Sequence, residues 1–348
     1  MIKKLKEVCD FYTGTGFPIK YQGKTEGIFP FYKVGDIANN VMSGNIYLSH
    51  CNNYISLDDI KEIKGTIIPE GVVVFAKIGE ALKLNRRVIT TRKCLIDNNA
   101  MGIGAKPEYL DSKFFYYYMK KLKMETYAES TTVPSVRKSR LEELLIDIPS
   151  FEKQKLIVNI LSKIHNIINN RRIQLLKFEE LIKARFVEMF GDLRANSKGW
   201  PIHTFREITE IITDGEHITP RRVDHGIYLL SARNVLDHSL QLDDVDYIDQ
   251  EEYERISKRI VPMAGDVLIS CSGSVGRCCM VPIGLKFQMV RSVAILRFKN
   301  ILVPKYAEYM ISSDELQDQI SRAKTASSQA NLFQPKLYPI MCSTIITL

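Results

Sequence analysis

An uninterrupted amphipathic stretch of about 40 residues constrains the fold of this 348-residue chain most strongly. Between Phe151 and Phe190, apolar residues recur almost always at steps of three, four or seven, and the stretch contains neither glycine nor proline. Pro149-Ser150 supplies an extended residue and an N-cap before it, and Gly191 supplies a stop after it. The pattern predicts one helix about 60 Å long. Two core helices joined without a break are the alternative.

The predicted helix carries one main apolar row, which we expect to bind a partner. Its members are Ile157, Leu161, Ile164, Ile168, Leu175, Ile182, Phe186 and Met189. A second row, at Leu156, Ile160, Ile167, Leu176 and Leu181, broadens this face. A helix with so wide an apolar face needs more than one neighbour.

The segments on either side of the helix have similar lengths and read as short strands with turns. Several stretches of the first segment recur in the second in the same order and at nearly the same offset. The matched stretches are 32–37 with 230–235, 68–79 with 261–273, and 114–119 with 306–310. The middle pair keeps proline, turn glycine, strand and closing glycine, with one residue inserted. This pattern indicates a duplicated unit.

The usual catalytic and cofactor motifs are missing from the sequence. The seven cysteines form no C-x-x-C pair and have no histidine at zinc-ligand spacing, which predicts reduced thiols and no metal. No complete P-loop, Gly-x-Gly-x-x-Gly fingerprint or Gly-x-Ser-x-Gly elbow occurs, and the six histidines are scattered. No window is apolar enough to span a membrane, and charges follow the first residues closely. We therefore expect a cytoplasmic, non-catalytic protein without a cofactor.

Basic residues exceed acidic residues by eight, which favours an anionic partner without naming one. Residues 1–148 hold 22 basic and 17 acidic residues, residues 149–192 hold 8 and 5, and residues 193–348 hold 18 of each. The polar loops at 13–18, 129–138, 213–222 and 323–331 hold the hydroxyl, amide and guanidinium groups that phosphate and base-edge contacts require. Ordinary surface loops use the same residues.

Three motifs in a fixed order resemble the specificity subunit of type I restriction-modification systems. Ile-Pro-Ser-Phe-Glu-Lys-Gln opens the helix at 148–154, Phe-Gly-Asp at 190–192 and Asn-x-x-Gly-Trp at 196–200 close it, and Asp-Gly-x-His-x-Thr-Pro follows at 214–220. The resemblance covers nearly the whole chain. It implies a mixed α+β fold in which two β-rich target-recognition domains, 1–148 and 193–348, are joined by a long coiled-coil-type helix over 149–192.

The resemblance also implies a function. A specificity subunit is non-catalytic and reads a bipartite site on double-stranded DNA, one half-site for each domain. Its helices dock the methyltransferase subunits, which bring S-adenosylmethionine and methylate adenine N6, and a nuclease-translocase subunit joins the complex for cleavage.

We expect DNA contacts at the polar loops and at the turns after the matched strands. Phosphate contacts are expected from Arg137, Lys138 and Lys324, and base-edge contacts from Thr15, His217, Thr219, Ser328 and Gln329. The remaining candidates are Lys33, Lys77, Thr131, Thr132, Arg221, Arg222, Arg233 and Arg277. Any one of them, taken alone, is more often an ordinary solvated surface residue. Eight acids between Asp237 and Glu254 cancel the charge of the second domain, and we expect this acidic run to face away from DNA or toward a partner.

One feature departs from the family pattern. The family carries a second long helix after the second domain, whereas here the sequence ends at Leu348, where that helix would begin. We expect either that a second specificity chain supplies the missing helix or that the product is truncated. A scaffold that assembles through its exposed helix without reading DNA is the alternative function. A stand-alone methyltransferase is disfavoured, because no Asn/Asp-Pro-Pro-Tyr/Phe motif occurs.

Overall fold

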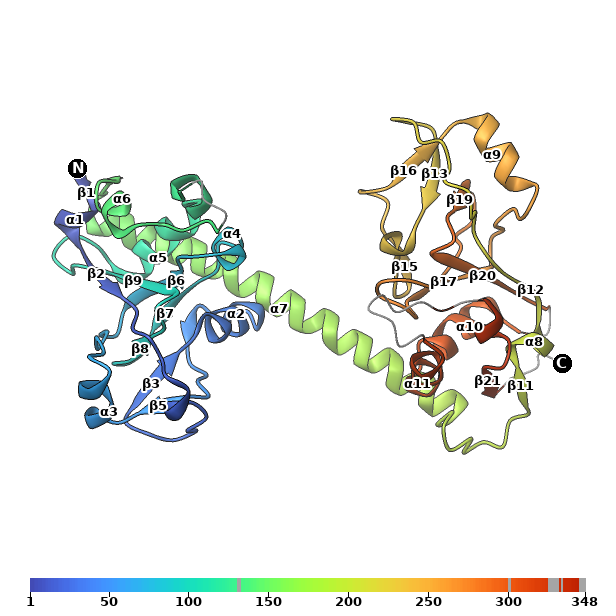
Figure 1. Cartoon of the computed structure of the whole chain (residues 1–348), viewed down its shortest axis with the longest axis horizontal. Helices are drawn as coiled ribbons and strands as arrows, with labels where there is room; N and C mark the ends of the chain where they lie inside the picture. The colour runs from blue at the N-terminus through green and yellow to red at the C-terminus, as the bar shows by residue number, and fades with distance from the viewer. Residues whose placement is uncertain (130–132, 300–301, 325–331, 333, 344–348) are drawn as a thin grey trace. The chain divides into compact units, whose positions relative to one another are not determined.

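The computed structural model describes residues 1–129, 133–299, 302–324, 332 and 334–343. The chain divides into two compact units, Met1–Leu176 (unit 1) and Lys177–Leu348 (unit 2). Helix α7 (Phe151–Phe190) is a single α-helix of 40 residues that contributes to both units (Figure 1). The predicted helix and the mixed α and β fold class are confirmed, and the alternative of two joined helices is wrong.

Unit 1 combines ten strands with short helices among the residues described. The strands are β1 (Ile2–Lys4), β2 (Cys9–Thr13), β3 (Phe29–Tyr32), β4 (Tyr47–Leu48), β5 (Tyr54–Ile55), β6 (Val72–Ala76), β7 (Arg87–Thr90), β8 (Leu95–Ile96), β9 (Ala100–Ala105) and β10 (Leu145–Asp147). The helices are α1 (Leu5–Val8), η1 (Ile19–Tyr21), α2 (Val34–Met42), α3 (Leu57–Glu62), α4 (Glu80–Lys83), α5 (Ser112–Lys121), η2 (Met124–Tyr127) and α6 (Lys138–Glu142).

Unit 2 has a similar set of elements after α7. Its strands are β11 (Ile202–Thr204), β12 (Thr209–Asp214), β13 (Ile227–Leu230), β14 (Val235–Leu236), β15 (Ser239–Leu240), β16 (Asp246–Ile248), β17 (Val267–Ser270), β18 (Cys278–Met280), β19 (Phe287–Met289), β20 (Val293–Phe298) and β21 (Met341–Ser343). Its helices are α8 (Phe205–Ile208), η3 (Ala232–Asn234), α9 (Gln250–Ser257), α10 (Pro304–Ile311), α11 (Asp314–Ala323) and α12 (Gln334–Leu337).

The strand pairing of the two units confirms the duplication. Unit 1 has a sheet ordered β2-β9-β6-β7-β4, and unit 2 has one ordered β12-β20-β17-β18. In the smaller sheets, β3 lies antiparallel to β5 and parallel to β8, just as β13 lies antiparallel to β16 and parallel to β19. The pairs β1–β10 and β11–β21 also correspond. A further match, 2–13 with 202–213, escaped the sequence comparison although both stretches begin with Ile, end with Thr and share a central Glu.

Strand β6 shows why these sheets need an almost continuous apolar sequence. Successive side chains of a strand point to opposite faces. Val73 and Phe75 enter the core that contains α5, whereas Val72 and Val74 enter a second core on the other face. All five residues of β6 are buried as a result. Each large apolar side chain fully buried in this way contributes roughly 1.5–3 kcal/mol.

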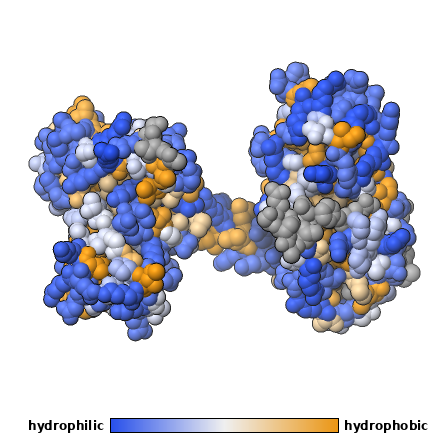
Figure 2. Space-filling model, viewed as in Figure 1, coloured by the Kyte–Doolittle hydropathy of each residue, from blue (hydrophilic) through white to orange (hydrophobic). Residues whose placement is uncertain are grey.

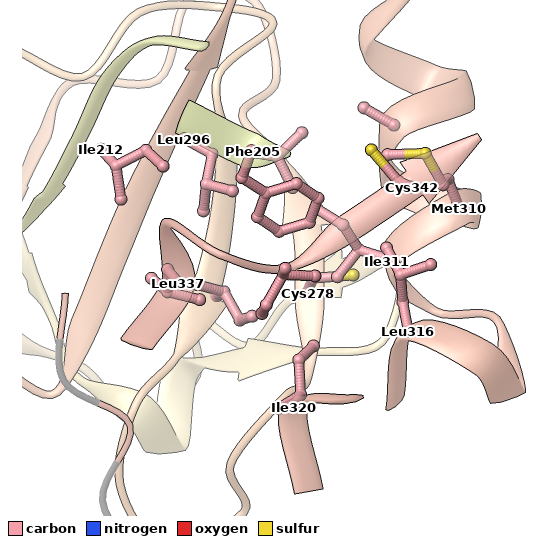
Figure 3. Packing of buried hydrophobic residues seen from close by; sticks show 14 of the residues in the cluster. Phe205, Ile212, Cys278, Leu296, Met310, Ile311, Leu316, Ile320, Leu337 and Cys342 are labelled. Carbon is pink, nitrogen blue, oxygen red and sulfur yellow. The ribbon is translucent and has the colours of Figure 1, made fainter. Parts of the chain in front are cut away.

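The main core of unit 2 is assembled from segments far apart in the sequence. Phe205 of α8, Leu296 of β20 and Ile311 of α10 are fully buried in one cluster with Leu337 of α12 (Figure 3). The cluster covers the same face of β17–β20 that α5 covers in the sheet of unit 1. The packing therefore repeats along with the strand pairing.

Helix α7 is fixed to unit 1 by a buried amide. Gln154 is completely buried, and its Oε1 accepts the backbone N–H of Asp111 at 2.8 Å. Its Nε2 donates to the carbonyl oxygens of Tyr109 and Pro149, both at 3.0 Å. Because a buried polar group left unpaired is costly, these three bonds fix the first turn of the helix on unit 1.

The end of α7 in unit 2 is fixed by aromatic packing instead. The ring of Phe186 lies 4.8 Å from that of Phe190 and 5.6 Å from that of Tyr306 on α10. Trp200, the single tryptophan of the sequence, donates its Nε1–H to the carbonyl of Phe190 at 2.8 Å. Phe186, predicted to face a partner, therefore packs within unit 2, because its ring completes this aromatic cluster.

All seven cysteines are free, as predicted, and six of them are buried. Burial raises the pKa of Cys9, Cys94, Cys271, Cys278 and Cys342 to about 12, and that of the half-buried Cys51 to about 11. Burial also raises the pKa of Cys279. Within the described part of the chain, no helix carries a stretch long and apolar enough to cross a lipid bilayer.

Candidate nucleic-acid interface

The turn between β8 and β9 organises the candidate residues of unit 1. Thr15 forms a parallel bridge with Asp97, and its N–H donates to the carbonyl of Ile96 at 2.9 Å. The N–H of Lys77 donates to the carbonyl of Asn99 at 2.9 Å on the other side of the turn. Asp97 is buried and accepts backbone N–H groups at both carboxylate oxygens. The structure therefore brings Thr15 and Lys77 to one turn.

Lys33 joins this group through the start of α2. The carboxylate of Asp97 accepts the N–H of Val34, the residue after Lys33, at 3.2 Å. The Lys33 ammonium lies 5.6 Å from the centre of the Phe17 ring, which stacks on Phe31 at 3.7 Å. Lys33 is only half-buried, so its charge remains available at the surface of this sheet.

The loop that ends at α6 lies against the glycine turn after β6. Gly79, whose φ is +73°, donates its N–H to the carbonyl of Pro134 at 2.8 Å, and Val136 donates to the carbonyl of Lys77 at 2.9 Å. Arg137 and Lys138 are thereby placed beside Lys77. Arg137 forms an ion pair with Glu129 at 2.7 Å, and Lys138 forms one with Glu142 at 3.5 Å, so both charges are partly offset within the loop.

Unit 2 repeats the close approach of loop and turn found in unit 1. A Cβ at Gly14 would lie 1.7 Å from the carbonyl oxygen of Asp97, and one at Gly215 would lie 2.3 Å from that of Met289. Only glycine fits at these two positions. Next to Gly215, His217 is exposed and its Nε2 lies 2.9 Å from the carboxylate of Asp214, while Thr219 is exposed.

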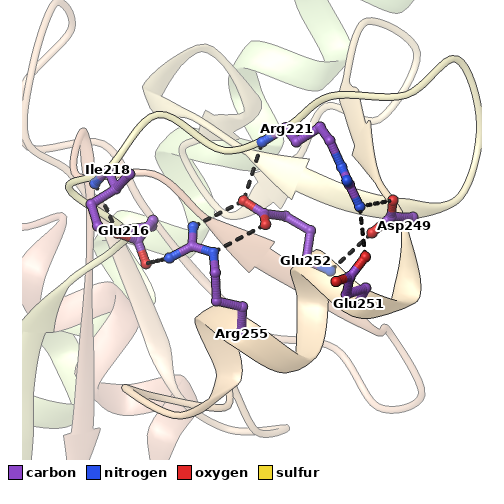
Figure 4. Close-up of polar contacts among 7 residues, drawn as sticks. All are labelled: Glu216, Ile218, Arg221, Asp249, Glu251, Glu252 and Arg255. Atoms are coloured by element: carbon purple, nitrogen blue, oxygen red, sulfur yellow. Dashed lines mark hydrogen bonds and ion pairs between the residues drawn. The ribbon is translucent and has the colours of Figure 1, made fainter.

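Three of the arginines predicted to contact DNA in unit 2 are bound by carboxylates of the acidic run, and Figure 4 shows the contacts of Arg221. The Arg221 guanidinium lies 2.7 Å from Asp249 and 3.0 Å from Glu251, and these hydrogen bonds raise the pKa of Arg221 further, Glu251 contributing most. Arg222 and Arg233 share the carboxylate of Asp246, at 2.9 and 3.0 Å.

The acidic run therefore lies against these arginines, and the expectation that it faces away from DNA or toward a partner stays a prediction. Strand β16 and the start of helix α9 carry the acids directly against the loop of Arg221 and Arg222 and against η3, which carries Arg233. The spacing in sequence did not reveal these contacts. Arg255 of α9 adds a second set of ion pairs in Figure 4, with Glu252 at 2.9 Å and Glu216 at 3.4 Å.

The last candidates of unit 2 are dispersed. Arg277 lines a cavity of about 520 Å³ together with Lys183, Asp237, His238 and other residues. Lys324 is half-buried just after α11. Four candidates lie outside the described residues, namely Thr131, Thr132, Ser328 and Gln329.

Helix α7 exposes most of the apolar row that we predicted to bind a partner. Ile157, Ile164, Ile168, Leu175, Ile182 and Met189 are exposed, whereas Leu161 is half-buried. Gln154 is the one buried residue of the helix. Hydrophobic side chains are visible on the surface of α7 in Figure 2. Such a continuous exposed apolar face is typical of a surface that another protein covers.

Sequence reasoning missed two groups with unusual charges. Arg87 is completely buried, and Lys120, Lys121 and Lys123 cluster at the end of α5. The charge distribution could have pointed to these basic residues, because the excess of basic over acidic residues is larger in 1–148 than in the other segments. Among the described residues, no three His, Cys, Asp or Glu side chains are arranged to hold a metal ion.

The matches with known proteins define the class of this chain. The sequence-family model described as type I restriction modification DNA specificity domain matches residues 1–177, which is half of the chain. The chain belongs to this family.

Two curated relatives are type I restriction enzyme specificity subunits of Methanocaldococcus jannaschii. The MjaIX subunit is 26% identical over 196 residues, which cover 54% of this chain and 42% of the relative. The MjaVIII subunit is 20% identical over 269 residues, which cover 72% of this chain and 63% of the relative. The match thus spans about half the length of these relatives.

Two solved structures share the fold. The S subunit of a type I restriction-modification system from M. genitalium matches with a TM-score of 0.55 and 15% identity, over 99% of this chain and 85% of its own. A structure described as showing complex assembly and conformational transition of the type I R-M system matches with a TM-score of 0.50 and 16% identity, over 98% and 84%. The likeness therefore covers both units and α7.

Proposed function

We propose that this chain is the non-catalytic DNA-recognition subunit of a type I restriction-modification complex and reads a bipartite site on double-stranded DNA. One observation carries the proposal: the family match covers unit 1, and unit 2 repeats its strand pairing. Two copies of one recognition fold in a chain suit two half-sites. The candidate loops around Asp97 in unit 1 and Gly215 in unit 2 occupy corresponding places in this repeat.

The proposal includes the boundaries of the two recognition domains and of the helix between them. Recognition domains at 1–148 and 193–348, with a spacer helix at 149–192, place α7 between two readers. The methyltransferase subunits, which would methylate adenine N6, dock on the exposed row of α7. The nuclease-translocase subunit joins through that complex, and a second specificity chain is the further candidate for pairing with α7.

Methylome sequencing tests the DNA-reading function directly. The chain is co-expressed with its methyltransferase subunit in a host that lacks other modification systems. We expect one bipartite motif to become methylated, and the motif to vanish when this gene is deleted. Uniform binding to every duplex and an unmethylated genome would reject the proposal.

The role of α7 is tested by exchanging apolar residues for charged ones. The double variant Ile168→Arg/Leu175→Arg places two charges on the exposed row, and we expect it to lose co-purification with the methyltransferase subunit. The control Gln174→Arg adds one charge next to this row and should keep the complex. Equal recovery from all three chains would contradict docking on this face.

The exposed row of α7 also favours the alternative, an assembly scaffold that does not read DNA. Titration with salt separates the two functions, because phosphate contacts release counterions and make DNA binding steeply dependent on salt. A scaffold shows no such dependence.

A further inference from the structure

A cluster of basic residues on unit 1 is separate from the loops discussed so far. Two segments, 80–87 and 120–125, hold six basic residues and two acidic ones, Glu80 and Glu125. These 14 residues therefore carry four of the five excess positive charges of residues 1–148. The basic members are Lys83, Arg86, Arg87, Lys120, Lys121 and Lys123, which we call the basic patch.

Hydrogen bonds join the two segments although they are remote in sequence. The side-chain amide of Asn85 donates to the carbonyl of Lys120 at 3.0 Å, and Nη2 of Arg87 donates to the carbonyl of Leu122 at 2.9 Å. The segment that follows α4 and the end of α5 are thereby held together in unit 1. The patch is a fixed part of the fold.

Arg87 adds a positive charge beneath this surface. Its side chain is completely buried, and its hydrogen bonds go to the backbone or amide oxygens of Asn85 and Leu122. Among the described residues no carboxylate pairs with Arg87, and its Nε has no hydrogen-bond partner. Burial lowers the pKa of Arg87 to about 10, so the guanidinium stays charged at neutral pH. A buried cation is ordinarily paired with an anion.

The other cations of the patch are exposed, apart from the half-buried Arg86, and most of them form no ion pair with the residues described. Lys83 forms an ion pair with Glu80 at 2.7 Å. The side chains of Arg86, Lys120, Lys121 and Lys123 form no ion pair within the described ranges. Lysines in the last turn of α5 complement the helix dipole, but this effect does not account for Arg86 or Arg87.

The patch also adjoins the candidate loops of unit 1. Helix α4 begins directly after Gly79, whose N–H donates to the carbonyl of Pro134 in the loop that leads to Arg137. A ligand that contacts Lys77 and Arg137 can therefore extend onto the patch. A long polyanion fits such a surface better than a single small anion.

We propose that the basic patch binds the phosphate backbone of duplex DNA beside the half-site read by unit 1. This inference rests on the proposed function, because it extends the same interface. Contacts of this kind hold the duplex in position and carry no sequence information.

The test compares two variants of the full chain with the same net charge. Lys120→Gln/Lys121→Gln/Lys123→Gln removes three cations from the patch. The control Lys24→Gln/Lys61→Gln/Lys64→Gln removes three exposed lysines on and near α3, two of which pair with Asp59 and Asp58. Binding to a duplex of about 30 base pairs is measured by fluorescence anisotropy between about 50 and 200 mM salt.

We expect the patch variant to bind every duplex about tenfold or more weakly and to lower the slope of log K against log salt by about 2–3. The control should change affinity less than about threefold. A third variant, Lys120→Arg/Lys121→Arg/Lys123→Arg, keeps the three charges and should bind as the unchanged chain does. Circular dichroism melting verifies that all variants fold.

The outcomes separate this inference from the proposed function. If the patch variant keeps the salt dependence of the unchanged chain, or if the control loses as much DNA affinity as the patch variant, the patch does not bind DNA. Either result leaves the proposed sequence-specific reading intact. If the patch variant has a lower salt dependence but the unchanged chain binds all duplexes equally well, the patch binds DNA and the proposed sequence-specific reading is rejected. An unchanged chain that binds no duplex overturns both.

Discussion

Unit 1 and unit 2 share their strand pairing but bury charges of opposite sign beside the same strand pair, β6–β7 in unit 1 and β17–β18 in unit 2. Arg87 pairs with Phe75 in the β6–β7 ladder, and Cys278 pairs with Ile269 in the β17–β18 ladder. Beside Cys278 in unit 2, Glu308 is completely buried and bound by His238 at 2.9 Å and Lys305 at 2.7 Å.

The surface segments near these buried charges also differ in the sign of their charge. Segments 80–87 and 120–125 of unit 1 are basic, whereas the matching segments 271–277 and 312–318 of unit 2 hold one basic and three acidic residues. Two of those acids, Glu315 and Asp318, pair with Arg194. Backbone pairing thus fixes the scaffold of both units while leaving the charge of each free to vary. The two units should contact an anionic partner unequally.

The largest expected effect tests the element that both units share. Gly14→Ala and Gly215→Ala should each destabilise their unit by about 3 kcal/mol, because the new Cβ would overlap a backbone carbonyl. Gly16→Ala is the control, since a Cβ there meets nothing within 4 Å. Urea unfolding followed by circular dichroism measures all three. A mild effect at one glycine alone would show that the loops are not equivalent.

A second prediction separates the two ways in which α7 is attached. Gln154→Leu leaves the N–H of Asp111 and two carbonyls without partners and should destabilise unit 1 by about 2 kcal/mol. Amide hydrogen exchange at Asp111 should speed up. The fluorescence of Trp200, which reports on the aromatic end of α7, should follow the same unfolding curve as before. Unchanged protection of Asp111 would mean that the amide is not the anchor.

A third prediction addresses the buried charge of unit 2. Burial raises the pKa of Glu308, but the hydrogen bonds from His238 and Lys305 lower it more, so the net shift is downward. A carboxylate with a lowered pKa stabilises the fold above its unfolded pKa, and this contribution is lost as pH falls through the folded pKa. Glu308→Gln should therefore cost about 1–2 kcal/mol at pH 7 and progressively less below about pH 4. Urea unfolding followed by Trp200 fluorescence measures this, and a difference that does not depend on pH would contradict it.

The smallest expected effect concerns the paired arginines of unit 2. Because Asp249, Glu251 and Asp246 already bind them, Arg221→Gln/Arg222→Gln should weaken duplex binding less than about threefold. The patch variant of unit 1 provides the comparison in the same anisotropy assay. If the unit 2 variant loses more duplex affinity than the patch variant, unit 2 and not unit 1 makes the stronger phosphate contacts.

Local patterns predicted the elements that depend on local sequence. The bounds of α7 followed from its periodicity and from Ser150 and Gly191, and the repeat followed from turn glycines such as Gly71 and Gly265, both of which adopt positive φ. The ion pairs of Arg221 with α9 and the buried position of Arg87 depend on packing between remote segments. The spacing of residues in the sequence predicts neither. The sequence therefore located the candidate loops but could not tell which of their basic side chains are already paired with carboxylates.

The burial of the thiols has a practical consequence for labelling. A thiol with a pKa of about 11 or 12 is almost entirely protonated at neutral pH, and only the thiolate reacts with maleimides. Six of the seven cysteines are also shielded from reagents, which leaves the half-buried Cys51 as the main competitor. A single cysteine introduced on α4 would accept a fluorophore selectively, so that the approach of DNA to unit 1 can be followed by energy transfer without first removing the native cysteines.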